Sequence, residues 1–158
     1  MNASSFSTAD RRFMDRALRL ARDASADGEV PIGAVITRGD KVVAEAANER
    51  EGRPDPTAHA ELIAIREAAR SLGGWRLPGT TMYVTLEPCA MCAGAIVLAR
   101  IPRVVYAADD PKAGAAGSVL DVLAEPRLNH RPRVESGLLA DESAEQLREF
   151  FRERRQAD

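Results

Sequence analysis

Four residues carry the strongest chemical signal in this sequence: His59, Glu61, Cys89 and Cys92. Cysteine thiolates and neutral imidazoles are preferred zinc ligands. Cys89 and Cys92 are three residues apart, so on a helix they share one face. Each ligand group also lies where a helix is expected to begin, and the unpaired N–H groups of a helix start favour a thiolate. The pattern predicts one zinc ion bound by His59, Cys89 and Cys92.

The number of ligands indicates what this zinc would do. A structural zinc site uses four protein ligands, whereas a catalytic one keeps a position for water. The chain has only two cysteines and two histidines, and the second histidine is His130. Water on the metal loses a proton more easily than free water, and Glu61 is placed to take that proton. His59 and Glu61 can serve one site only if it lies off the end of their helix.

Simpler interpretations of the same residues remain open. A Cys-x-x-Cys pair is often a redox pair or half of a structural zinc site. A lone Glu61 would ordinarily be a solvated helix residue. A non-catalytic RNA-binding module with a structural zinc would need His130 or another group as the fourth ligand. The proline before Cys89 and the His-x-Glu upstream favour the catalytic site.

Hydrophobic periodicity and turn signals indicate the elements that must position these residues. Helices are expected over residues 8–27, from about 57 to 70, from Pro88 until Pro102, near 119–123, and after Asp141 as a cap. Strands are expected at 30–36 and 41–47, joined as a hairpin, and at 82–86, 103–107 and 134–136. This order predicts an α/β fold, a three-layer α/β/α sandwich around a central mixed five-stranded sheet.

Length and composition limit the class of protein. With 158 residues, the chain is expected to form a single domain, 1–158. Apolar residues make up 45% and charged residues 29%, which excludes a wholly disordered chain. The net charge of −2 restricts any nucleic-acid contact to a local patch. No secretory run is visible, and the longest apolar stretch, residues 89–99, is too short for a bilayer, so a cytoplasmic protein with no membrane contact is expected.

Longer segments resemble a known enzyme family. The metal signature resembles the zinc-dependent cytidine and adenosine deaminases. Other segments, from about Phe13 to Arg155, are similar to the bacterial tRNA adenosine deaminases in particular. These segments are DPTAHAE at 55–61, YVTLEPCAMCAGA at 83–95, GAAGS at 114–118, NH at 129–130 and FFR at 150–152. The resemblance implies a cytidine-deaminase-like fold.

The resemblance also implies an activity and a substrate. It implies hydrolytic deamination of adenosine to inosine at the wobble position of an arginine tRNA, with one zinc ion per chain and no nucleotide cofactor. It implies a homodimer that binds the tRNA anticodon stem-loop, and the apolar helix at 90–99 is either the dimer face or core. The alternative within enzymes is a deaminase of a free base or nucleoside, such as guanine, cytosine or cytidine.

Several substrate-binding residues follow from the resemblance, each with a simpler structural alternative. Asn48 would contact the target base or only end a strand, and Asp110 would meet RNA or only turn the chain. Phe150 and Phe151 also fit the apolar stripe of the last helix, whose Arg152, Arg154 and Arg155 would meet phosphates or form a solvated face. The residues implied to line the pocket are Val30, Leu86 and Pro88, and those implied near RNA are Asp110, Asn129, His130 and Phe151.

Overall fold

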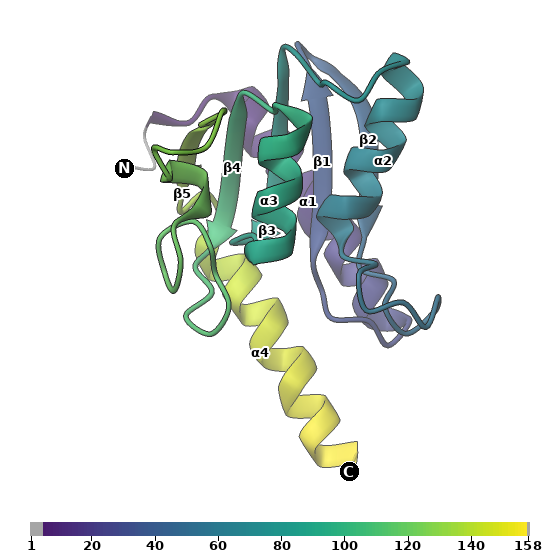
Figure 1. Ribbon diagram of the computed structural model, residues 1–158. Coiled ribbons are helices and arrows are strands. Elements are labelled where there is room, and N and C mark those ends of the chain that lie inside the picture. Colours follow the sequence, from purple (N-terminus) through teal and green to yellow (C-terminus); the bar gives the residue numbers. More distant parts are fainter. Residues whose placement is uncertain (1–4, 158) are drawn as a thin grey trace.

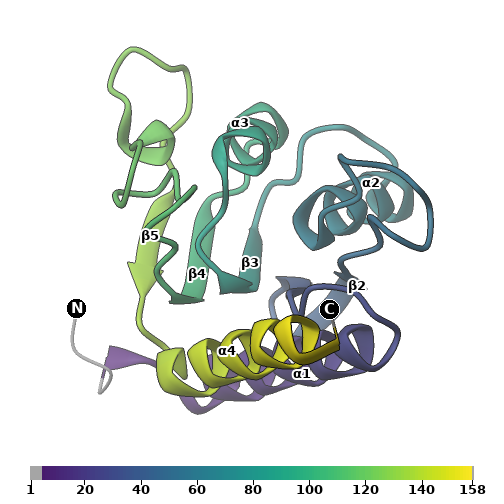
Figure 2. The same ribbon diagram turned by 90° about the horizontal axis from the view of Figure 1, so that it is seen from below.

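The computed structural model describes residues 5–157 and places a five-stranded sheet between two layers of helices (Figures 1 and 2). The elements in chain order are α1 (Thr8–Ala26), β1 (Gly33–Arg38), β2 (Lys41–Ala47), α2 (Ala60–Leu72), β3 (Thr80–Leu86), α3 (Ala90–Ala99), β4 (Arg103–Ala108), η2 (Val122–Ala124), β5 (Arg133–Ser136) and α4 (Ala140–Ala157).

The strand order is β2-β1-β3-β4-β5. β1 is antiparallel to both β2 and β3, whereas β3, β4 and β5 run parallel. Figure 2 shows α1 and α4 together on one face of the sheet and α2 and α3 on the other. The predicted α/β sandwich with a mixed five-stranded sheet is therefore confirmed.

Alternating side chains of the central strands build two cores. Val35, Tyr83 and Val105 point to the α1 side, where they pack with Phe13 and Met14. Their neighbours along the strands point to the opposite side and pack with alanines and Ile96 of α2 and α3: Ala34, Ile36, Met82, Val84, Val104 and Tyr106. Both faces of the sheet are thus buried, which explains why these strands are almost continuously apolar.

Several expected boundaries shift by a few residues. The first strand begins at Gly33 and not at residue 30; α2 begins at Ala60 and not near 57; α3 begins at Ala90, after Pro88. The short helix expected at 119–123 is the 3-10 turn η2, and Asp141 lies inside the first turn of α4 instead of capping it. A glycine is required at residue 33, where β1 begins. A Cβ there would lie 2.1 Å from the Ala17 carbonyl oxygen, so only glycine lets α1 pack this close to β1.

A buried ionic cluster fastens α1 to the far end of the sheet. Arg103 donates to both Asp10 oxygens at 2.9 and 3.0 Å and to Glu135 at 2.7 Å. The Tyr83 hydroxyl donates to Asp10 at 2.7 Å, and Asp10 also completes a capping box with Ser7. Although burial opposes it, the hydrogen bonds from Arg103 and Tyr83 hold the pKa of Asp10 well below its usual value.

None of the helices that the structure describes is long and apolar enough to cross a membrane.

Replacing Arg103 by methionine should destabilise the protein strongly. Asp10 would remain buried without a cation, and Glu135 would keep only the more exposed Arg133. Breaking a buried pair in this way costs about 3–5 kcal/mol of unfolding free energy. Because the pKa of Asp10 is lowered in the folded state, its contribution is present above the unfolded pKa of about 4 and is lost as pH falls below it. Urea unfolding at pH 7 and pH 3 measures both effects, and a variant within 1 kcal/mol of the parent at pH 7 would contradict the assignment.

Candidate active site

The predicted metal ligands meet where two helices begin. His59 is the N-cap of α2 and Cys89 is the N-cap of α3, and Cys92 lies in the first turn of α3. An N-cap side chain usually accepts a hydrogen bond from the helix it starts. Neither His59 nor Cys89 does so. Both side chains are instead directed to a common point off the two helix ends.

The spacing of the three ligand atoms fits a tetrahedral metal site. His59 Nδ1 lies 3.7 Å from Cys89 Sγ and 3.6 Å from Cys92 Sγ, and all three ligand atoms are within 4.8 Å of one another. Tetrahedral bonds of about 2.1 Å to nitrogen and about 2.3 Å to sulfur place those two atoms about 3.6 Å apart. The residues therefore form three corners of a tetrahedron that could hold a metal ion. In residues 5–157 this is the single group of its kind.

Hydrogen bonds within the group prepare a thiolate. The bond from Cys92 lowers the pKa of Cys89 to about 3, and the pKa of Cys92 is raised because its thiol donates to Cys89. The bond with Cys89 raises the pKa of His59. Cys89 is thus deprotonated at neutral pH, which is the form that binds a metal.

Glu61 lies in the first turn of α2, beside these ligands. It is 4% exposed, and its Oε1 atom is buried with no hydrogen-bond partner in the described part of the chain. Burial raises the pKa of this carboxyl group to about 7. A buried, unpaired carboxylate oxygen costs stability, so its presence next to the ligands indicates a chemical role.

Asn48 supplies the helix cap that His59 does not provide. Its Oδ1 atom accepts a hydrogen bond of 2.8 Å from the Ala60 N–H, at the start of α2, and its own N–H donates to Ile32. Asn48 is 3% exposed. The end of β2 and the start of α2 are therefore joined directly behind the metal ligand.

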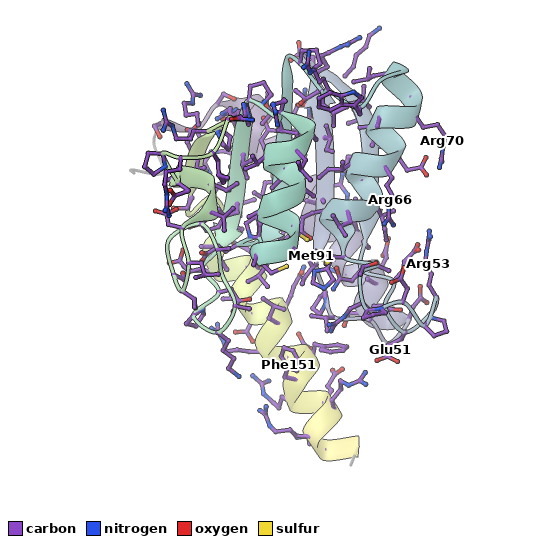
Figure 3. All side chains as sticks on the ribbon, viewed as in Figure 1. Glu51, Arg53, Arg66, Arg70, Met91 and Phe151 are labelled. Carbon is purple, nitrogen blue, oxygen red and sulfur yellow. The ribbon has the colours of Figure 1, made fainter. Side chains whose placement is uncertain are left out.

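A cavity of about 810 Å³ opens over this group. His59, Glu61 and Cys89 line its floor, while Cys92 is fully buried behind them. Five of the eight substrate-binding residues from the sequence analysis line it as well: Val30, Asn48, Leu86, Asp110 and Phe151. Phe151 comes from α4 (labelled in Figure 3), whereas its neighbour Phe150 is buried.

Comparisons with known proteins agree with this arrangement. The family model of the MafB19-like deaminases matches residues 8–155. The tRNA-specific adenosine deaminase of Bacillus subtilis is 49% identical over 148 residues, which cover 94% of this chain and 92% of that protein. The chain belongs to the tRNA-specific adenosine deaminase family.

Two solved structures are similar to this family member in fold and sequence. One comes from a study of A-to-I editing by tRNA:A34 deaminases at the wobble position of transfer RNA. It is 50% identical, has a TM-score of 0.83, and the match covers 86% of this chain and 99% of that one. The guanine deaminase of Bacillus subtilis is 38% identical with a TM-score of 0.62, over 77% of this chain and 81% of that one.

Three residues of the expected substrate site lie off the cavity. Pro88 is buried under it, and its carbonyl oxygen accepts a hydrogen bond from Ala115. The His130 ring donates to the Ile101 carbonyl oxygen at 2.6 Å, just before the paired starts of β4 and β5, and Asn129 is exposed beside it. Cys89 and Cys92 follow the C-terminal end of β3, which runs parallel to β4. The two ends of β4 are five residues apart, or about 17 Å at about 3.3 Å per residue. Asn129 and His130 are therefore at the opposite end of the sheet.

The cavity also has a basic rim that the sequence analysis identified only in part. Arg152 and Arg155 of α4 line it together with Arg50, Lys112 and Arg148. Arg154 instead stacks on Phe150 and donates to the Gly28 carbonyl oxygen. The sequence showed the arginines of the last helix, but Arg50 and Lys112 come from loops whose position only the fold defines.

Replacing Cys89 by alanine should remove the metal and the activity together. Two remaining ligands hold a metal poorly, and apparent affinity falls steeply with each lost ligand. Metal analysis of the purified variant, by plasma mass spectrometry, should find well under one ion per chain, against one in the parent. A full complement of metal in this variant would show that the ligand set is assigned wrongly.

Proposed function

We propose that this protein hydrolyses adenosine to inosine at the wobble position of transfer RNA, with an arginine tRNA as the substrate that its motifs imply. The observation that carries this proposal is the free Oε1 atom of Glu61, buried beside a His-Cys-Cys group at the floor of a cavity with a basic rim. The sequence relatives of known name support the same substrate. Such an enzyme would work in the cytoplasm, where tRNA is found.

Zinc is the metal that the ligand set favours, at one ion per chain. Two thiolates and one imidazole select zinc over magnesium or calcium, which prefer oxygen ligands. When bound, zinc lowers the pKa of a water molecule and so supplies a nucleophile at neutral pH. His59, Cys89 and Cys92 would hold it, and two of them, His59 and Cys89, line the cavity.

The residues around the metal site have two further roles, proton transfer and binding of the base. Glu61 takes the proton of the attacking water with its free Oε1 atom, passes it to the ring nitrogen of the adenine, and then assists departure of ammonia. Water is consumed and ammonia released, so the atoms balance without a further cofactor. Asn48 has its Oδ1 atom occupied by Ala60, which leaves its Nδ2 group to donate to the base.

The basic rim favours RNA over a free base. Five cationic side chains line the cavity and outnumber its four carboxylates, although the whole protein carries a net charge of −2. A neutral base gains nothing from them, whereas the phosphates on either side of an extruded nucleotide do. The anticodon loop offers such a nucleotide, since unpaired bases can be splayed into a pocket.

A direct assay decides between this function and its alternatives. The purified protein is incubated with the anticodon stem-loop of an arginine tRNA, and in parallel with adenosine, guanine, cytosine and cytidine. We expect inosine from the stem-loop and no product from the free compounds. Turnover of guanine with none of the stem-loop would favour a free-base deaminase, and metal binding without any turnover would favour a non-catalytic RNA-binding module.

Replacing Glu61 by alanine should preserve metal binding and abolish turnover. Glu61 is assigned to proton transfer and not to ligation, and removing a general acid–base group slows a reaction by about 10²-fold or more. Single-turnover kinetics on the stem-loop, together with zinc analysis, separate the two roles. Near-normal turnover would show that another group moves the proton.

Neutralising the arginines of α4 that line the cavity should weaken RNA binding. The variant replaces Arg148, Arg152 and Arg155 by glutamine, and it should raise KM for the stem-loop and flatten its dependence on salt, because each phosphate contact adds about one unit to the salt slope or slightly less. A matched variant replaces Arg12, Arg19 and Arg22 of α1, which do not line the cavity. An equal effect of the two variants would mean that only overall charge matters.

We also propose a homodimer through the exposed face of α3. Leu98 is 70% exposed, and Val119 and Leu120, which precede η2, are 54% and 52% exposed. α3 packs against η2, so these side chains lie on adjoining segments (α3 and its Met91 are seen in Figure 3). Solvent-exposed apolar groups of this kind are typical of an interface.

Introducing a charge on this face should disrupt the dimer. Replacing Leu98 by glutamate should shift the mass in sedimentation equilibrium from two chains to one, because a buried unpaired charge opposes association. Replacing the exposed Ala26 of α1 by glutamate serves as the control and should leave the mass unchanged. A Leu98 variant that keeps the mass of the parent would place any interface elsewhere.

A further inference from the structure

Glu87 is a second buried carboxylate at the active site, and its surroundings differ from those of Glu61. It follows the last residue of β3, precedes the ligand turn of Pro88 and Cys89, and is 2% exposed. Its Oε1 atom accepts from the Asp110 N–H at 3.0 Å, and its Oε2 atom from the N–H groups of Ala116 at 2.9 Å and Ser118 at 3.1 Å. The Ser118 hydroxyl donates as well.

The charge of Glu87 is therefore satisfied by the backbone of a single loop, residues 109–118. Hydrogen bonds to an ionised group are stronger than neutral ones, and several backbone N–H groups together form an anion-binding concavity. Although burial opposes it, the Ser118 hydroxyl and the three amides lower the pKa of Glu87. The carboxylate thus holds both ends of the loop at once.

The loop lies directly on this carboxylate and on the metal-binding turn. A Cβ added at Gly114 would lie 2.3 Å from the Glu87 Cδ atom, so there is no space between them. The Ala115 N–H donates to the Pro88 carbonyl oxygen at 2.8 Å, and Gly114 is paired with Cys89. Hydrogen bonds inside the loop, such as Gly114 N–H to Asp110, fix its shape but not its distance from the ligands.

The same loop forms one wall of the cavity, which Glu87 also lines. Its lining residues are Asp109, Asp110, Pro111, Lys112 and Ala113. The Asp110 carboxylate accepts from the N–H groups of Lys112 and Ala113, which shapes this wall locally. Glu87 lines the same cavity, so a substrate that reaches the metal ligands passes both this loop and the carboxylate that its amides hold.

We propose that Glu87 is a positioning residue for the substrate: its carboxylate fixes the 109–118 loop relative to the metal ligands, so that Asp110 and Lys112 meet the RNA entering the cavity. The inference rests on the proposed function for the identity of the substrate. It assigns to Glu87 an effect on substrate binding and none on proton transfer, which belongs to Glu61.

The principal test is Glu87→Gln, which keeps the side-chain volume but removes the charge and turns one acceptor into a donor. We expect KM for the stem-loop to rise about tenfold or more, as loss of precise positioning does, while kcat stays within about threefold and zinc stays at one per chain. The control is Glu135→Gln, a buried carboxylate of β5 that pairs with Arg103 and does not line the cavity. It should lower thermal stability and leave KM unchanged.

Amide hydrogen exchange tests the positioning without any substrate. In Glu87→Gln the amides of Asp110, Ala116 and Ser118 should exchange faster, by about tenfold or more, because hydrogen bonds to a charged group are the stronger ones. The amides of Glu51 and Gly52, which donate to the buried Glu29, provide the internal reference and should be unchanged. If the parent protein makes no inosine, the proposed function fails, and this measurement still judges the role of Glu87.

Ser118→Ala keeps the inference testable if Glu87→Gln does not fold. This variant removes one hydroxyl donor and no charge, so it should raise KM in the same direction but by less, and loosen the Ala116 amide. Unchanged KM and unchanged exchange in the folded variant would overturn the inference. So would a loss confined to kcat, or a KM increase in Glu135→Gln equal to that in Glu87→Gln.

Discussion

The active site depends on one constraint: α2 and α3 must begin close to the same point. The N-cap side chains of both helices must also make no capping hydrogen bond, so that they can turn toward each other. His59 and Cys89 both have extended backbone angles and make no capping bond. Asn48 accepts the hydrogen bond at the start of α2 in place of His59. The connection from β3 to α3 is too short to allow any other position for Cys89, since only Glu87 and Pro88 lie between the strand and the cap. The position of the ligand group is therefore fixed by where β2 and β3 end.

Four of the five buried carboxylates in residues 5–157 show how charges that hold the fold differ from one that is free for chemistry. Asp10 is compensated by the guanidinium of Arg103, Glu29 by the N–H groups of Glu51 and Gly52, and Glu87 by three amides and a hydroxyl. Each of these holds one segment against another. Glu61 alone among them leaves a buried oxygen with no partner in residues 5–157. Because burial without compensation costs stability, this free oxygen is what supports the proton transfer proposed for Glu61.

The sequence predicted which side chains come together better than it predicted the bounds of the elements that carry them. The ligand trio and Glu61 were identified because residue type and spacing restrict metal chemistry tightly, and a helix start was expected at each ligand group. The prediction placed those starts near residues 57 and 88, whereas the ligands themselves are the caps. Asn129 and His130 were expected near the RNA by resemblance, but the parallel pairing of β4 and β5 places them at the opposite end of the sheet. The sequence gives no signal for Glu87, because its partners are backbone N–H groups more than twenty residues away along the chain.

The residues at the floor of the cavity and the cationic residues at its rim come from different parts of the fold, which has a consequence for specificity. The metal ligands, Glu61 and Asn48 come from the layer of α2 and α3 and from the strand ends, where backbone hydrogen bonds determine their positions. The cationic side chains come from α4 and from two loops. α4 is held to the body by Ser143 to Thr85, by Gln146 to Leu18 and, further along, by Arg154 to Gly28. The end of α4 extends away from the sheet (Figure 1), and its second half carries Phe151, Arg152 and Arg155 along the cavity. Under the proposed function, changes in the rim would alter which molecule enters without moving the metal ligands or Glu61. The same fold is found in structures named for a tRNA:A34 deaminase and for a guanine deaminase, so the fold alone does not decide the substrate.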